Sequence, residues 1–258
     1  MANDKSVYTV TSVSKAFEIL ELLAEQPGGL HINALTAQLG MTRNKVYRLV
    51  STLCESGLLV QEKTSGHYVL GFSSFALGQK LVQQSSVINH AHPIIENLAR
   101  KHDEAVYMTV IRGDNVLFLD MADCDQQVKA VSLLGKQVPY FTNAAGKVMK
   151  ALESAEIIDW LKGLKRGKYK SIEDTEKLAC ELQEIRANGG VAVDCDGLGE
   201  GIISIAVAVK DYAGHVIGAI TMLGPSFRML QERIENELIP SLVEAAAATS
   251  EKFGYAPC

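Results

Sequence analysis

A run of polar and basic side chains between residues 42 and 51 has the types and spacing to bind nucleic acid. Arg43, Lys45 and Arg48 fall within one predicted helix, and no Asp or Glu occurs from residue 26 to 54. Arginine can donate two hydrogen bonds to guanine, asparagine can bind adenine in the same way, and lysine, serine and tyrosine can hold phosphates. An ordinary solvated helix face is the alternative. The predicted DNA contacts are Thr42, Arg43, Asn44, Lys45, Tyr47, Arg48, Ser51 and Lys63.

Local signals predict how this helix is positioned. Gly40 can adopt a positive φ that closes the preceding helix, and Thr42 can cap the next one, which should run from Arg43 to about Glu55. Apolar residues repeat every three or four positions on the side opposite the polar face. This stripe is formed by Val46, Leu49, Val50 and Leu53.

The flanking segments complete a small domain. Two β-rich runs, 58–61 and 67–70, are separated by residues with turn chemistry, which predicts a hairpin. Upstream, Val13, Phe17, Leu20 and Leu23 predict a first helix with one apolar stripe, and Pro27-Gly28-Gly29 ends it. Helix, helix, turn, helix and hairpin together predict a winged helix-turn-helix domain.

The remaining chain alternates strand and helix patterns. Apolar residues from Phe72 to Leu81 predict a linker helix, and another helix follows from Val87 with Pro93 near its first turn. Two hairpins are predicted at 104–123 and 202–223, and helices at 144–152, 155–164, 175–188 and 229–253. Strands joined by short turns predict an antiparallel sheet covered by helices, an α+β fold. The predicted organisation is a first domain at 1–72, a linker helix at 73–86 and a second domain at 87–258.

Composition narrows the class of protein. The first 15 residues lack the apolar core of a signal peptide, and no run reaches the roughly 20 apolar residues of a membrane span, so we expect a cytoplasmic protein without a membrane partner. Residues 1–80 hold seven basic and six acidic side chains, whereas the remainder holds 18 and 24. We expect free thiols, no metal and no cofactor, because no CxxC pair occurs among Cys54, Cys124, Cys180, Cys195 and Cys258.

Several longer segments carry a family resemblance. They are residues 12–71, from SVSKAFEIL to GHYVLG, then VPYFTNAAGKVMKAL, GVAVDCDGLGEGIISIAVAV and GAITMLGPSFR. In order and spacing the chain resembles the IclR family of bacterial transcriptional regulators. The resemblance implies a winged helix joined by a linker helix to a GAF-like, profilin-like effector-binding domain. It also implies dimers, pairing into tetramers, that bind a palindromic operator in double-stranded DNA.

The segment that opens the helix at residue 144 is a candidate ligand site. Small residues at Ala144, Ala145 and Gly146 leave first-turn N–H groups uncovered, and these groups favour a carboxylate. Close packing of the helix on the sheet is the alternative. The resemblance implies a pocket shared with the later hairpin, and the uncovered N–H groups favour a small organic acid as its effector. The positions that match the family's pocket are Ala144, Ala145, Asp194, Ser204, Thr221 and Leu223. An apolar wall is predicted from Leu133, Leu134 and Leu223.

Two features of that predicted pocket leave its chemistry open. Many family members have Cys where this chain has Ser204, and the hydroxyls of Ser204 and Thr221 could instead be satisfied within a core. Asp194 would repel a carboxylate ligand unless it were protonated or paired.

An enzyme is the rival class. The sequence Asp-Cys-Asp occurs at 123–125 and 194–196, so a GAF-like redox enzyme could use Cys124 or Cys195. Carboxylates beside a thiol disfavour the thiolate, and no histidine has suitable spacing for a metal site. No nucleophile elbow, HExxH sequence or glycine-rich nucleotide loop occurs. A winged helix that binds only protein is a third possibility, but the acid-free basic helix disfavours it. We therefore predict a regulator and not an enzyme.

Overall fold

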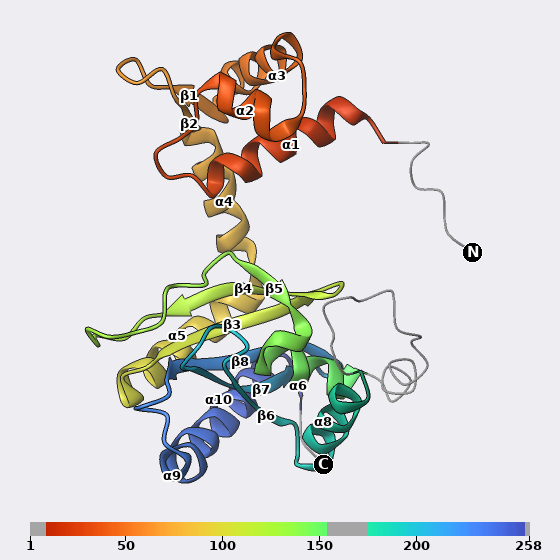
Figure 1. Cartoon of the computed structure of the whole chain (residues 1–258). Helices are drawn as coiled ribbons and strands as arrows, with labels where there is room; N and C mark the ends of the chain where they lie inside the picture. The colour runs from red at the N-terminus through yellow and green to blue at the C-terminus, as the bar shows by residue number, and fades with distance from the viewer. Residues whose placement is uncertain (1–8, 154–174, 256–258) are drawn as a thin grey trace. The chain divides into compact units, whose positions relative to one another are not determined.

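The computed structural model describes residues 9–153 and 175–255 (Figure 1). Its contacts divide the chain after Ser85 into two compact units, and each is described by itself. The helix predicted at 155–164 lies outside the described residues.

The described part of the first unit, residues 9–85, forms three helices, a hairpin and a fourth helix. The elements are α1 (Thr11–Ala24), α2 (Ile32–Leu39), α3 (Arg43–Glu55), β1 (Leu59–Gln61), β2 (Tyr68–Leu70) and α4 (Phe72–Gln84). Gly40 ends α2 in the left-handed region with a φ of 60°, as predicted. Thr42 occupies the N-cap position of α3, as predicted, and its side chain makes no capping hydrogen bond.

The buried face of α1 differs in part from the predicted one. Leu23 is buried as predicted, but Val13 and Phe17 are 52% and 60% exposed, and Ile19 is buried in their place. The helix carries a second apolar stripe with the same three-and-four spacing, and this stripe packs into the core. Buried residues from every helix before the hairpin and from both strands form that core: Ile19, Leu23, Ile32, Leu35, Val46, Val50, Leu53, Leu59 and Tyr68.

The second unit is built on a six-stranded antiparallel sheet. Its strands are β3 (Ala105–Arg112), β4 (Asn115–Ala122), β5 (Gln137–Pro139), β6 (Val191–Cys195), β7 (Ile202–Lys210) and β8 (Val216–Pro225), in the order β5-β4-β3-β8-β7-β6. Both predicted hairpins are present, β3 with β4 and β7 with β8. The pairing of β3 with β8 joins them side by side, which brings segments more than 100 residues apart into register.

Helices cover both faces of this sheet. On one face, α6 (Ala144–Glu153) and α8 (Thr175–Ala187) pack over a core that includes Tyr107 and Phe118. On the other, α5 (Ser86–His102) and α10 (Ile239–Lys252) pack over Met108 and Ile220. A 3-10 turn, η1 (Tyr140–Thr142), precedes α6. The α+β architecture predicted from the strand and helix patterns is therefore confirmed.

Two helices differ in detail from the prediction. Pro93 lies inside α5 and not near its first turn, because the helix already begins at Ser86. The predicted helix 229–253 is divided into α9 (Gln231–Arg233), a π-helical segment η2 (Ile234–Leu238) and α10. Among the residues that the structure describes, no helix is long and apolar enough to span a membrane.

Candidate functional site

The polar face of α3 is exposed, and its opposite face is buried. Val46, Val50 and Leu53 anchor the helix in the core, which leaves the predicted DNA contacts facing away from it. Tyr47 is 57% exposed, and Ser51 is half-buried. The predicted contacts that α3 or its N-cap brings together are Thr42, Arg43, Asn44, Lys45, Tyr47, Arg48 and Ser51.

Electrostatically, this face is available to an anion. No carboxylate within the described residues pairs with Arg43, Lys45 or Arg48. The Thr52 hydroxyl donates to the Arg48 backbone carbonyl oxygen at 3.0 Å, so this bond does not use the guanidinium group of Arg48. Among residues 9–85, therefore, no carboxylate neutralises the cations of α3.

The hairpin holds Lys63 apart from α3. Lys63 is exposed in the six-residue turn between Gln61 and Tyr68, which are paired across β1 and β2. The turn is closed by the Gly66 N–H, which donates to the Glu62 carbonyl oxygen at 2.9 Å. Lys63 is thus presented on a wing, as the sequence predicted.

The first turn of α6 has one N–H group without a partner among the described residues. The Ala144 N–H donates to Ser204 Oγ at 3.2 Å, and the Gly146 N–H donates to Asn143 Oδ1 at 2.9 Å. The N–H group of Ala145 lies between these two donors in the helix and donates to neither Ser204 Oγ nor Asn143 Oδ1. Close packing also holds here, since a Cβ on Gly146 would collide with the backbone of Tyr140.

Ser204, Thr221 and Leu223 are buried on the sheet face that α6 covers. Ser204 is the register partner of Leu223, and Thr221 is the register partner of Tyr107 on the neighbouring strand. Thr221 Oγ1 lies 3.2 Å from Thr109 Oγ1. These hydroxyls therefore have partners within the core.

Two residues of this face, Tyr107 and Thr109, were not predicted from the sequence. Thr109 donates to the Ala219 carbonyl oxygen at 2.9 Å, and the Leu133 N–H donates to the Tyr107 hydroxyl at 3.4 Å. The alternation of Tyr107 and Thr109 along a predicted strand was a usable signal, but the neighbouring strand β8 lies far away in the sequence.

The carboxylate of Asp194 is paired with a cation, which removes the predicted repulsion between Asp194 and a carboxylate ligand. Its carboxylate accepts from the Lys147 ammonium group and from the Gly197 N–H. Lys147 also pairs with Glu181 at 2.9 Å. Burial lowers the pKa of Lys147, but its hydrogen bonds to the two carboxylates outweigh burial, and the pKa is raised. Lys147 was not among the predicted site residues.

The two predicted wall residues differ in placement. Leu133 is half-buried and packs against the core beneath α6. Leu134 is 53% exposed and does not join that core. The structure therefore does not bring Leu134 to the other predicted effector contacts.

The Asp-Cys-Asp segments are placed differently from each other. Cys124 is buried and Cys195 is exposed on β6. Within residues 9–153 and 175–255, no three His, Cys, Asp or Glu side chains are grouped to hold a metal ion.

Comparison with known proteins identifies both units. Residues 12–63 match the family model of the IclR helix-turn-helix domain, and residues 79–251 match that of the bacterial transcriptional regulator IclR C-terminal domain. The chain is 31% identical to the HTH-type transcriptional regulator KdgR of Escherichia coli (strain K12), over 99% of this chain and 98% of that protein.

Solved structures share the fold. An IclR transcriptional regulator from Alicyclobacillus acidocaldarius superposes with a TM-score of 0.82 and 25% identity, over 96% of this chain and 100% of that one. An IclR homolog complexed with 4-hydroxybenzoate, from Microbacterium hydrocarbonoxydans, superposes with a TM-score of 0.77 and 18% identity, over 95% and 100% of the two chains. The second similarity concerns the fold alone. With a DNA-binding helix-turn-helix and an effector-binding domain both matched, this chain belongs to the IclR family of bacterial transcriptional regulators.

Proposed function

We propose that this regulator binds a palindromic operator as a dimer and changes its DNA affinity when a small organic acid occupies the second unit. The observation that carries the DNA part is the exposed face of α3, whose three cations have no internal carboxylate partner in the described chain. Arg48 and Asn44 read bases, whereas Lys45 and, from the wing, Lys63 hold phosphates. A regulator of this kind acts in the cytoplasm, where it meets its operator.

The first turn of α6 supports the effector class. The Ala145 N–H lacks a partner within the described residues, and it points from the positive end of a helix dipole. A carboxylate there would accept from Ala145 while Lys147 neutralises Asp194 nearby. The fold relative that was solved with 4-hydroxybenzoate, itself an organic acid, agrees with this class.

Exposed apolar side chains support self-association. On α4, Phe72 is 81% exposed, Phe75 60% and Leu81 63%, and no residue of the helix is buried. Monomeric proteins rarely expose a contiguous apolar surface of this kind. A dimer that covers α4 places two copies of α3 on the half-sites of a palindrome, and dimers then pair into tetramers.

Control by the effector is a shift of population. An acid that binds one arrangement of the paired second units more tightly raises the fraction of molecules whose reading helices fit the operator, or lowers it. Because the family is one of transcriptional regulators and not of enzymes, the alternative of a redox enzyme using Cys124 or Cys195 is disfavoured.

The test begins with the purified full chain and a random-sequence DNA pool. Selection should enrich a palindromic duplex, and a thermal-shift screen of small organic, sugar and aromatic acids should find one that raises the melting temperature. That acid should change the affinity for the enriched duplex. If no sequence is enriched, the DNA proposal is wrong. If a duplex is enriched but no acid shifts the melting temperature, the effector class is wrong. Turnover of an acid would favour the enzyme.

A further inference from the structure

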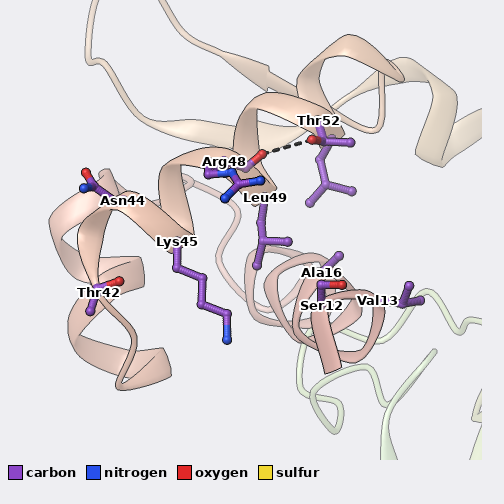
Figure 2. A pocket seen from close by; sticks show the side chains of 10 residues that line it. Ser12, Val13, Ala16, Thr42, Asn44, Lys45, Arg48, Leu49 and Thr52 are labelled. Carbon is purple, nitrogen blue, oxygen red and sulfur yellow. Dashed lines mark hydrogen bonds between the residues drawn. The ribbon is translucent and has the colours of Figure 1, made fainter. Parts of the chain in front are cut away.

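A groove of about 730 Å³ lies between α1 and α3 in the first unit (Figure 2). One wall is the first half of α1, with Ser12, Val13 and Ala16, and the other is α3 from its N-cap to Leu53. Figure 2 shows Lys45 and Leu49 extending from α3 toward α1. The predicted recognition face and this groove share side chains, since Asn44, Lys45 and Arg48 belong to both.

The chemistry of the groove combines a cationic rim with an apolar floor. Lys45 and Arg48 supply two positive charges, and the described residues that line the groove include no Asp or Glu. Neither cation has a carboxylate partner in the part of the chain that the structure describes. Ser12 and Thr42 add exposed hydroxyls, and Leu49 forms part of the floor. A sugar–phosphate strand has the matching chemistry, with charged phosphates on one side and apolar sugar edges on the other.

We propose that this groove holds the DNA sugar–phosphate backbone beside the major groove that α3 enters, with Ser12 of α1 against a phosphate that Lys45 also approaches. The proposal rests on the proposed DNA reading by α3 and adds α1 as a second contacting element. The groove is continuous with the face of α3 that is predicted to read DNA. This favours DNA over a second copy of the chain as the occupant, because a protein in the groove would cover Arg48 and Asn44. Phosphate contacts fix register without reading sequence, so Ser12 acts as a positioning residue.

A gain-of-function variant tests the proposal. Ser12→Lys places a third cation in the groove, so binding should tighten about tenfold near 0.1 M salt and the slope of log affinity against log salt should steepen by about 0.9. Ser12→Asp should weaken binding about tenfold. Both changes should be similar on a mixed-sequence 30-base-pair duplex and on the duplex enriched by selection, because the contact is to the backbone.

Ser14 offers the matched control. It lies two residues further along the same helix turn, is half-buried and does not line the groove. Ser14→Lys and Ser14→Asp should bind DNA within about twofold of wild type. If Ser12→Lys binds DNA no more tightly than Ser14→Lys, the proposal is overturned. A change of oligomeric state by Ser12 variants, without a change of DNA affinity, would assign the groove to a second copy instead.

The same titrations separate this inference from the proposed function. Wild-type protein that prefers no duplex, or Arg48→Ala that binds the enriched duplex like wild type, would remove the reading role of α3 itself. Normal behaviour of those two proteins together with inert Ser12 variants would remove only the contact from α1.

Discussion

The ammonium group of Lys147 on α6 pairs with the carboxylate of Asp194 on β6, 47 residues further along the chain. Both side chains are largely buried, at 12% and 8% exposure. The pair fixes the first turn of α6 against the sheet, so the orientation of the Ala145 N–H depends on it. An ion pair buried to this extent is costly to break from one side, because the remaining charge stays desolvated.

Lys147→Met should destabilise the protein by about 3 kcal/mol, since it leaves Asp194 with only the Gly197 N–H. Asp194→Asn should cost less, about 1 kcal/mol, because Lys147 keeps its bond to Glu181. Urea unfolding followed by circular dichroism measures both values. Equal losses for the two variants would contradict a network in which Lys147 has two carboxylate partners and Asp194 has one cationic partner.

His102, at the end of α5, should make stability fall in mild acid. Burial lowers the pKa of His102, and the positive charges of Lys101 and Arg233 lower it further. The carboxylates of Glu237 and Glu104 raise the pKa, but their effect is smaller. Its Nε2 has no hydrogen-bond partner among the described residues. As the pH falls through 6.5, the unfolded chain takes up this proton before the folded chain does. Stability is therefore present above that pH and is lost below it, by at most about 1.4 kcal/mol per pH unit.

His102→Phe should remove this contribution, so the free energy of unfolding should change less between pH 7.5 and 5.5 than in wild type. Parallel pH dependence in wild type and His102→Phe would show that His102 is not the group responsible.

Arg48→Ala and Lys45→Ala should weaken DNA binding in distinguishable ways. Loss of a bidentate arginine contact costs about 1 to 3 kcal/mol and relaxes one base position of the enriched duplex. Loss of a phosphate contact weakens binding to every sequence and reduces the salt slope by about 0.9. Fluorescence anisotropy with single-position variants of the duplex checks both. An Arg48→Ala protein that keeps its base preference would move Arg48 to the phosphate class.

Ala145→Pro should abolish effector binding with little change in fold. Proline is tolerated in the first turn of a helix and deletes the N–H that has no partner among the described residues. Calorimetry with the acid that gives the largest thermal shift measures the loss, and DNA binding without the acid serves as the control. Unaltered calorimetric binding would place the carboxylate elsewhere.

These features differ in how far the sequence could predict them. The bounds of α3 follow from local signals, the left-handed Gly40 and the apolar stripe, and they were predicted correctly. The buried face of α1 could not be predicted in full, because the helix has two equally regular apolar stripes. Only contact with the other helices selects Ile19 over Phe17 for burial. Lys147 could not be recognised as the partner of Asp194, since no local pattern encodes a pairing between a helix and a distant edge strand.

Phe75→Glu combined with Leu81→Glu should convert the protein to monomers and weaken operator binding. Both side chains are exposed on α4, and burying a carboxylate without a partner in an apolar dimer interface is strongly unfavourable.

Gln79→Glu is the control, because it adds a charge to an exposed polar position of the same helix. Light scattering should give half the control's mass, because only the interface formed by α4 is broken. Because neither substitution touches α3, the isolated reading helix keeps its contacts, and the affinity lost is that of joining two half-sites. A monomeric variant that bound the full palindrome as tightly as the control would show that dimers do not set operator affinity.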